Sequence, residues 1–461
     1  MLKADQFVAL GKHGLGNPRS QVAHSMAYFR DCIYLGVTHP RGEGPQDAAR
    51  ILRYDCCNQR WEEVHRSPLV QADDKATARD VYRGGIGQGK PNLLRSRGVA
   101  EQVPRDRGYR CMAVVHDRRL GSNVLYVSTL SHWGSRLLRS VDGRHFDAAS
   151  EPGLGKPDVL SFRALTAFKD KLFVGPAGSV DSEVMDRNFG EIARLYVADD
   201  PESGKWEEAM PPGFGNPDNK SIFSMAVFNH FLYAGTGNPA RGFQLWKTRA
   251  EGDPPYQWTP VIDDGAARYN LNETATTMVV FNDSLYIGSG LPGLGYDKAN
   301  DVGPGAAELI RVNADDSWDL LIGAPRFSPA GLKVPLAVFG PGFDDPYNSV
   351  FWSMAIHNGN LYVGTHHWES WQVALSGGKT MKGGFQLWGT EDGENWELIT
   401  ADGFGNPFSH GVRTLVSSPH GLFLGTSTHR EIERLWFRLS DQRGRTPGTG
   451  GLEIWCGGLS A

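Results

Sequence analysis

The chain has 461 residues, a formal net charge of -5 and 21% charged residues, which is ordinary for a soluble protein. The negative charge gives no support for general nucleic-acid binding. No cationic and apolar signal segment opens the chain and no apolar run approaches membrane-spanning length, so we expect a cytoplasmic protein without a membrane partner. Five cysteines, an odd number without Cys-x-x-Cys spacing, predict reduced thiols.

A phrase resembling Met-x-x-Phe-Asn-x-x-Leu-Tyr-x-Gly-Thr recurs along the chain, most clearly at residues 224–236, 277–289 and 353–365. Each copy joins two alternating apolar runs through a short polar turn, which predicts two antiparallel strands. A third run of the Phe-Gln-Leu-Trp type follows, and then an Asp-Gly turn before an aromatic residue. Four-stranded units of roughly 40–50 residues predict the blades of a β-propeller, an all-β fold.

The second-strand phrase occurs seven times, which predicts a single seven-bladed domain over residues 1–461. The copies, in chain order, lie at residues 32–36, 124–128, 171–175, 231–235, 284–288, 360–364 and 421–425. The loop at 14–18 matches the loops at 213–217 and 403–407, each of which follows the end of a blade. We therefore expect the N-terminal strand to complete the last blade and close the ring, which removes open sheet edges.

Long insertions are expected on one face of the ring, because the turns predicted for the opposite face are all short. The insertions are residues 67–108, 176–192, 291–307, 324–349, 366–384 and 427–451. Long loops in compact domains are usually functional or disordered, so these predict walls and a lid around a pocket at the channel mouth. The alternative is a set of tolerated surface insertions.

The residue two places before the Met or Leu of each first strand is expected near the axis. These residues are His24, Arg110, Arg163, Phe223, Thr276, Trp352 and Arg413. Arginine binds carboxylate or phosphate through two donors and also stacks on rings, so this set predicts a small anionic or aromatic substrate. Glu273 is expected nearby, as a partner of one arginine. A structural salt-bridge ring that plugs the channel is an equally weighted alternative.

Histidines gather in the loops between second and third strands. His39 and His367 share one repeat position, His132 and His429 lie one position further on, and His366 is adjacent. A general acid or base, with Glu369, Asp297 or Glu431 as a carboxylate partner, needs only one or two of them. A four-histidine metal site is not favoured, since packed sheets lie about 10 Å apart. The cofactor is left open, and hydrogen bonds within loops are the remaining interpretation.

Aromatic residues accompany these histidines. Trp133, Trp368 and Tyr296 fall in the same loops and predict a stacking surface for an aromatic or lipidic substrate.

The phrases at residues 403–407, 411–415 and 422–426, with Gly451-Leu452-Glu453-Ile454-Trp455, look like the propeller half of cyanobacterial cyclophane-forming alkylating enzymes. The resemblance implies a seven-bladed propeller and natural-product chemistry. The calcium-binding N-terminal domain of those enzymes has no counterpart in these 461 residues, so the resemblance supplies no catalytic residue.

The leading hypothesis is a monomeric enzyme that binds a small anionic or aromatic metabolite and carries out acid–base assisted bond formation or rearrangement. One alternative is a non-catalytic scaffold for a protein partner. Another is a metal-dependent or His/Tyr/Arg lyase. A deep pocket favours the enzyme, whereas a flat exposed apolar patch favours the scaffold.

Overall fold

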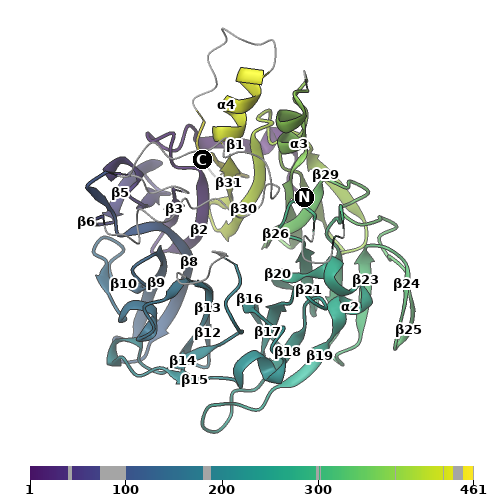
Figure 1. The fold of residues 1–461 in the computed structure, drawn as a ribbon, viewed down its shortest axis with the longest axis horizontal. Coiled ribbons are helices and arrows are strands. Elements are labelled where there is room, and N and C mark those ends of the chain that lie inside the picture. The colour runs from purple at the N-terminus through teal and green to yellow at the C-terminus, as the bar shows by residue number, and fades with distance from the viewer. Residues whose placement is uncertain are drawn as a thin grey trace. The chain divides into compact units, whose positions relative to one another are not determined.

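The computed structural model describes residues 1–39, 44–72, 100–179, 188–296, 301, 303–378, 380–428, 430–439 and 450–459. The chain forms two compact units. Unit 1 comprises Met1–Ala23, Phe223–Arg249 and Trp258–Ala461, and unit 2 comprises His24–Ile222 and Ala250–Gln257. Both units consist mainly of antiparallel strands (Figure 1).

Unit 2 holds sheets built from strands that follow one another in the chain. The first comprises β2 (Val22–Phe29, most of it in this unit), β3 (Cys32–Thr38), β4 (Arg50–Asp55) and β5 (Arg60–Arg66). The second comprises β8 (Asp106–Asp117), β9 (Ser122–Ser131), β10 (Leu137–Ser140) and β11 (Asp147–Ala148). The third comprises β12 (Val159–Phe168), β13 (Lys171–Ser179), β14 (Tyr196–Ala198) and β15 (Glu207–Glu208). A separate hairpin pairs β6 (Leu69–Gln71) with β7 (Gln102–Pro104).

Unit 1 repeats this plan. Its strands are β16 (Ser221–Phe228, most of it in this unit), β17 (Phe231–Gly237), β18 (Leu245–Thr248) and β19 (Thr259–Ile262), then β20 (Thr274–Phe281), β21 (Ser284–Gly290), β22 (Leu309–Val312) and β23 (Trp318–Ile322). The hairpin β24 (Arg326–Ser328) and β25 (Gly331–Lys333) follows. Next come β26 (Asn348–His357), β27 (Asn360–His367), β28 (Leu387–Thr390) and β29 (Trp396–Thr400), and finally β30 (Ser409–Ser418), β31 (Gly421–Thr428) and β32 (Ile454–Gly457).

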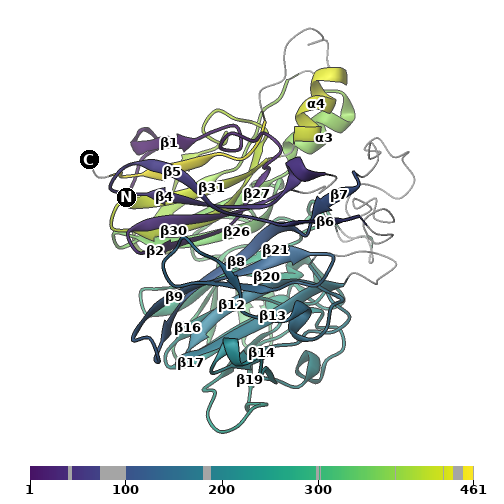
Figure 2. The ribbon, with the colours of Figure 1, turned by 90° about the vertical axis from the view of Figure 1, so that its left-hand side faces the viewer.

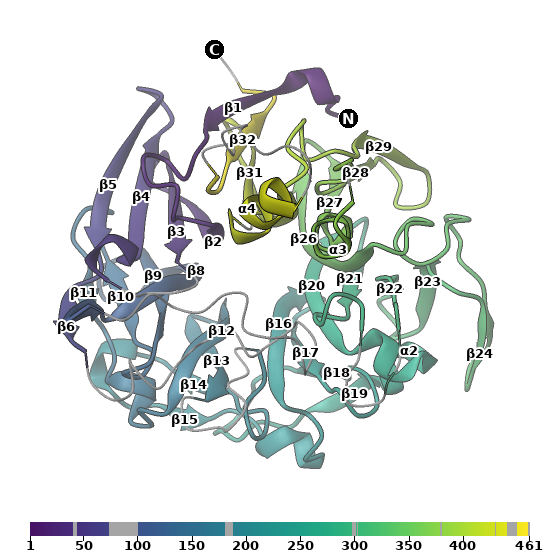
Figure 3. The same cartoon turned by 45° about the horizontal axis from the view of Figure 1, so that its top comes forward.

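The N-terminal strand completes the last sheet, as expected from the sequence. Strand β1 (Phe7–Gly11) pairs antiparallel with β32, with Phe7 opposite Gly457 (Figure 3). Phe7 then packs with Phe404, at 5.1 Å between ring centroids. Neighbouring sheets are joined near strand ends by single residue pairs, such as His366 with Gly411. The all-β, propeller-class architecture is therefore confirmed, while the count of seven blades stays a prediction.

Burial explains why the second strands have the strongest sequence signal. Every residue of β27 and β31 is buried, because both faces of these inner strands pack against other strands. The outer strand β5 has no fully buried residue. An inner strand therefore shows a nearly continuous apolar run, and an outer strand shows weak patterning.

The Gly-Phe-Gly-Asn-Pro phrase is a left-handed turn. Gly403 and Phe404 both have positive φ, 64° and 53°, and a Cβ at Gly403 would lie 2.6 Å from the Asn406 carbonyl oxygen. Glycine is therefore required there. Gly342 and Phe343 repeat the pair of positive φ angles without the full phrase, so the turn is more widespread than the motif.

Short 3₁₀ helices occupy several of the turns and connections. They are η1 (Ala4–Gln6), η2 (Pro45–Asp47), η3 (Pro152–Leu154), η4 (Pro201–Ser203), η5 (Pro212–Gly215) and η6 (Tyr269–Asn272), and the short α2 (Asp264–Ala267) precedes η6.

Two predicted loop insertions contain helices. Helix α3 (Glu369–Ser376) forms in the insertion 366–384, and α4 (Arg430–Leu439) forms in the insertion 427–451. They lie side by side (Figure 2), and the Trp436 indole donates a 2.9 Å hydrogen bond to the Gly378 carbonyl. The sequence predicted only loops in both insertions, and this prediction was wrong. None of the described helices is long and apolar enough to cross a membrane.

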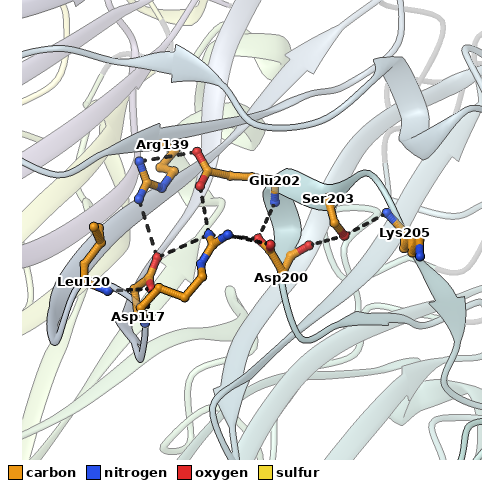
Figure 4. Close-up of polar contacts among 8 residues, drawn as sticks. Asp117, Leu120, Arg139, Asp200, Glu202, Ser203 and Lys205 are labelled. Atoms are coloured by element: carbon orange, nitrogen blue, oxygen red, sulfur yellow. Dashed lines mark hydrogen bonds and ion pairs between the residues drawn. The ribbon is translucent and has the colours of Figure 1, made fainter.

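A partly exposed ion-pair network joins the second and third sheets of unit 2 (Figure 4). Arg119 bonds to Asp200 at 2.7 Å and to Glu202 at 3.0 Å, and Arg139 lies 3.5 Å from Asp117 and 3.4 Å from Glu202. Solvent screens such pairs, so we assign the network a structural role with a small effect on stability.

Candidate functional site

Five of the predicted axis residues share a backbone feature. Arg110, Arg163, Thr276, Trp352 and Arg413 each stand at a register shift between the first and second strands of their sheet. Such a β-bulge leaves one residue outside the ladder and re-aims its side chain. The repeat therefore provides one recurrent position at which the side chain is free to vary.

In unit 1 the bulges bring together a compact group, the Trp352 cluster, which consists of Ser349, Trp352, His366, His410 and Arg413. The His366 ring lies edge-on to the Trp352 ring at 4.9 Å between centroids, and the His410 ring lies 6.1 Å from Trp352. The two imidazoles are 5.2 Å apart and perpendicular, at 89°. Arg413 places its guanidinium 5.3 Å from the centre of the Trp352 ring. A hydrogen bond of 3.0 Å joins Ser349 Oγ to His366 Nδ1.

The side chains of the Trp352 cluster differ in solvent exposure. His366 is 7% exposed and His410 is 2% exposed, whereas Trp352 and Arg413 are half-buried. The indole packs directly on Gly411, since a Cβ at that residue would lie 2.3 Å from Trp352 Cζ3. The cluster thus combines a partly exposed cation and indole with two buried imidazoles.

His410 is a member of the cluster that the sequence did not predict. It stands at a second register shift of β30, three residues before Arg413. Ser349 has the same relation to Trp352 in β26, and Arg107 has it to Arg110 in β8. The sequence pattern that could have identified His410 is a second variable position, three residues before each predicted axis residue. By the same spacing from Thr276, Glu273 belongs to this series.

His367 belongs to a different group from its neighbour His366. Its Nε2 donates a 3.1 Å hydrogen bond to Asp345 Oδ2, and its ring lies 5.6 Å from that of Tyr347. Burial alone raises the pKa of the Asp345 carboxyl, but hydrogen bonds from His367, Tyr347 and Gln386 outweigh it and hold that pKa below its ordinary value. Asp345 stands where the equivalent loop has Asn406, so the acid is a departure from the repeat.

Glu369 and His367 approach the same glycine, while the predicted pairing of Glu369 with a histidine stays a prediction. A Cβ placed on Gly383 would be 2.8 Å from Glu369 Oε2 and 3.3 Å from His367 Nδ1. Both groups therefore face the same glycine. Asp345, His367 and Glu369 provide an imidazole with a carboxylate on one side and a second carboxylate nearby.

The other candidates in unit 1 are more dispersed. Trp368 packs edge-on against Tyr347 at 4.9 Å. The Tyr296 hydroxyl donates to the Asp301 carboxylate, and the side chain is exposed. Phe223 and Glu273 are buried, and the Glu273 carbonyl accepts from the Asn238 backbone N–H. His429, Asp297 and the side chain of Glu431 lie outside the described residues.

In unit 2 two predicted arginines meet at one residue. Arg110 Nη2 and Arg163 Nη1 each donate to Asn188 Oδ1, both at 2.9 Å. Arg110 also donates to Ser161 Oγ at 2.6 Å and is buried. Asn188, another residue missed by the sequence analysis, therefore holds two guanidinium groups close together. We call Arg110, Arg163 and Asn188 the arginine pair.

The remaining candidates of unit 2 have separate surroundings. His24 Nδ1 lies 2.7 Å from Thr38 Oγ1. His39 is buried, and its backbone N–H donates to the Arg107 carbonyl. His132 is buried, and the half-buried Trp133 donates its backbone N–H to Ser131 Oγ at 3.2 Å. In the part of the chain that the structure describes, no group of three or more His, Cys, Asp or Glu side chains is arranged to hold a metal ion.

No protein-family model and no curated protein matches the chain. Among solved structures, PorZ of Porphyromonas gingivalis, a surface component of the type-IX secretion system, is similar at a TM-score of 0.50 and 13% identity. The match covers 95% of this chain and 47% of PorZ, so the chain spans about half the length of that protein. YCF48 from Cyanidioschyzon merolae matches at a TM-score of 0.48 and 11% identity, over 98% of both chains. The GH74 xyloglucanase of Xanthomonas campestris matches at 0.48 and 15%, over 92% of this chain and 52% of that one.

Likeness at such low identity shows the fold alone. The chain is an all-β protein of the β-propeller class. Its particular feature is a set of bulged first strands that carry histidine, tryptophan and arginine in unit 1 and paired arginines in unit 2.

Proposed function

We propose that the protein is an enzyme that acts on a small aromatic anion bound at the Trp352 cluster. One observation carries the proposal: the guanidinium of Arg413 and the imidazoles of His366 and His410 all lie against the same indole ring. Binding groups and proton-transfer groups are thereby gathered within the reach of one small molecule.

Binding would use the two half-buried residues. Arginine's planar fork matches a carboxylate or phosphate through two parallel hydrogen bonds. The indole face offers stacking for an aromatic body attached to that anion. A ligand with both features engages Arg413 and Trp352 together, whereas a simple inorganic anion or an uncharged ring engages only one.

Chemistry would use the two buried histidines. Imidazole is the side chain that gains and loses a proton near neutral pH. A rearrangement needs one group that removes a proton from the ligand and another that returns a proton to a different atom. Two imidazoles side by side supply both without any oxidant. The resemblance to cyclophane-forming enzymes suggests natural-product chemistry as the setting, and the cytoplasm stays the expected location.

The binding half is tested by calorimetric titration with indole-3-carboxylate, with indole and cyclohexanecarboxylate as ligands that lack the charge or the aromatic ring. Arg413→Gln is expected to weaken binding of indole-3-carboxylate by about tenfold to a hundredfold, the usual range for a hydrogen bond to a charged group. Arg249→Gln is the matched control, because Arg249 also lies over an aromatic ring, that of Phe231, at 4.7 Å. Equal affinities in both variants would contradict the proposal.

The catalytic half is tested by hydrogen–deuterium exchange into a bound probe. Phenylpyruvate is an aromatic anion with acidic carbon-bound hydrogens, and NMR in D₂O follows their loss. The wild type should accelerate exchange over buffer, and His366→Gln and His410→Gln should abolish the acceleration while binding persists. Acceleration that survives in both variants would assign proton transfer to other groups, with the His367 and Glu369 pair as the next candidate.

An interaction scaffold is the second candidate function, and one observation favours it. Five large apolar side chains are exposed within residues 327–338 of unit 1. An exposed apolar patch of this kind usually marks a protein interface. Association and catalysis are compatible, since the patch and the Trp352 cluster share no residue.

A further inference from the structure

The arginine pair of unit 2 is unusual in the chemistry of the residue that its two guanidinium groups share. Arg110 and Arg163 both donate to the side-chain oxygen of Asn188, which is a neutral amide. At Glu202 and at Glu308, by contrast, the residue that two arginines approach is a carboxylate. The arginine pair therefore differs from these groups in having a neutral side chain between its cations.

The two guanidinium groups lie close to each other. Arg110 Nη2 and Arg163 Nη1 are each 2.9 Å from the same oxygen, so these two nitrogens are separated by at most twice that distance. Like charges at such a separation repel each other, and a negative charge between them turns the repulsion into attraction. Arginine keeps its proton in proteins, so the pair stays cationic. The geometry therefore favours an anion at the point where the two groups meet.

Arg110 is held in place by the neighbouring sheet. Strands β8 and β12 lie side by side (Figure 3), and Arg110 Nη1 donates a 2.6 Å hydrogen bond to Ser161 Oγ of β12. The Ser161 hydroxyl in turn donates to the Ala177 carbonyl at 3.1 Å. Ser161 is fully buried, and Arg110 is 3% exposed. The Arg110 guanidinium is therefore positioned before a ligand arrives, which lowers the entropy cost of binding.

Arg163 and Asn188 form the more accessible side of the arginine pair, since both are half-buried. Asn188 lies in the connection between β13 and β14, outside both strands. A change of its side-chain rotamer would therefore leave the sheet hydrogen bonds intact. A ligand that approaches from this side can replace the amide oxygen without any change in the sheet.

We propose that the arginine pair binds a phosphate group, with one phosphate oxygen in the position that the Asn188 side-chain oxygen now takes. The charges match, because a phosphate monoester carries about -1.5 to -2 at pH 7 and the pair provides two cations. A carboxylate would neutralise only one of them. The inference does not rest on the enzyme activity proposed for the Trp352 cluster, which belongs to unit 1.

The directions of the donors also favour phosphate over carboxylate. An arginine binds a planar carboxylate best through two parallel N–H groups. Arg110 instead directs Nη1 to Ser161 and Nη2 to Asn188, so these two donors do not form such a fork. The oxygens of a tetrahedral phosphate point in separate directions and suit donors that come from two different arginines.

Calorimetric titration of the full chain with inorganic phosphate and with glycerol 3-phosphate tests the proposal and distinguishes the free ion from an ester. The wild type should bind at least one of the two, and acetate should bind at least about tenfold more weakly. Arg163→Gln should raise the dissociation constant by about tenfold to a hundredfold, the usual effect of losing a hydrogen bond to a charged group. Arg53→Gln is the matched control, because Arg53 is a half-buried arginine of unit 2 that pairs with Glu62, and it should leave the constant unchanged.

Asn188→Asp is the sharper variant, because it adds a carboxylate at the position proposed for the phosphate oxygen. It should abolish measurable phosphate binding while the thermal midpoint shows that the protein stays folded. Asn123→Asp adds the same charge at the far end of the β8–β9 hairpin, where Asn123 lies opposite His116, and should leave binding unchanged.

A wild type that binds neither phosphate nor glycerol 3-phosphate at high millimolar concentration would overturn the proposal. Undiminished phosphate binding in Arg163→Gln or in Asn188→Asp would place the ligand elsewhere and would also overturn it. Equal affinity for acetate and phosphate would refute the assignment of a phosphate ligand.

Discussion

The Trp352 cluster of unit 1 and the arginine pair of unit 2 are built on the same backbone device and carry different chemistry. Both place their principal side chains at bulges of first strands. In unit 1 these side chains assemble imidazole, indole and guanidinium, whereas in unit 2 two guanidiniums converge on one amide oxygen. The fold therefore determines where a variable residue stands. The type of residue at that position determines which chemical groups come together there.

The same difference appears at an equivalent residue just before two of the third strands, β22 in unit 1 and β14 in unit 2. Glu308 of unit 1 is fully buried between Arg268, at 3.4 Å, and Arg326, at 2.8 Å. The equivalent residue of unit 2, Arg194, makes a partly exposed pair with Glu208. Equivalent positions thus differ in burial, and burial should decide the effect of substitution.

The largest expected effect comes from Glu308. Glu308→Gln keeps the shape but leaves two buried guanidiniums without their carboxylate, so it should lower the free energy of unfolding by about 3–5 kcal/mol. Arg194→Gln, the equivalent change in unit 2, should cost less than about 1 kcal/mol because solvent screens that pair. Denaturant unfolding measures both. An equal decrease in the free energy of unfolding in both variants would show that burial does not determine the effect of substitution at these two positions.

Two glycines at the same repeat position, two residues before a bulged arginine, test how tightly the backbone packs next to the bulge. A Cβ on Gly411 would lie 2.3 Å from Trp352 Cζ3, and a Cβ on Gly108 of unit 2 would lie 1.8 Å from Thr38 Oγ1. Gly411→Ala and Gly108→Ala should each destabilise by about 1–3 kcal/mol through overpacking. Only Gly411→Ala should weaken binding of indole-3-carboxylate, because it displaces the indole. Loss of binding in both variants would mean that the ligand site is not confined to the Trp352 cluster.

Substitution of Asn188 tests how charge affects the stability of the arginine pair. Asn188→Asp puts a carboxylate where two guanidiniums now share an amide oxygen, and charge-assisted hydrogen bonds are stronger than neutral ones. The free energy of unfolding should rise by about 1 kcal/mol at low salt, and the gain should shrink as salt is added. A decrease in stability would show that the arginines already have enough negative charge around them.

The smallest expected effect is on the pH dependence of folding stability. It comes from the aspartates of the Asp-Gly turns, which occur in both units. Burial alone would raise the pKa of Asp392, but hydrogen bonds from Asn395, Glu394 and Thr390 lower it from 3.8 to about 2. A depressed pKa stabilises the fold above pH 4, and this contribution is lost as the pH falls toward 2. The stability difference between wild type and Asp392→Asn should therefore be constant near neutrality and shrink between about pH 4 and pH 2. Asp142, whose pKa is also lowered by hydrogen bonds, should behave alike in unit 2.

Sequence reasoning succeeded where the chain repeats itself. The β-rich fold and the closing pair β1 and β32 follow from a register that repeated phrases define. Helices α3 and α4 were missed because no repeated copy exists with which to compare an insertion. Asp345 and Asn188 were missed because their importance lies in contacts with residues distant in sequence.

Indole NMR is the sharpest test of whether the Trp352 cluster binds an aromatic anion. The Nε1–H signal of Trp352, assigned by its loss in Trp352→Phe, is followed during titration with indole-3-carboxylate, benzoate and phenyl phosphate. We expect a saturable shift of that signal with at least one of these ligands, and no shift in Arg413→Gln. A Trp352 signal that stays fixed at high millimolar concentrations of all three would show that the cluster does not bind aromatic anions.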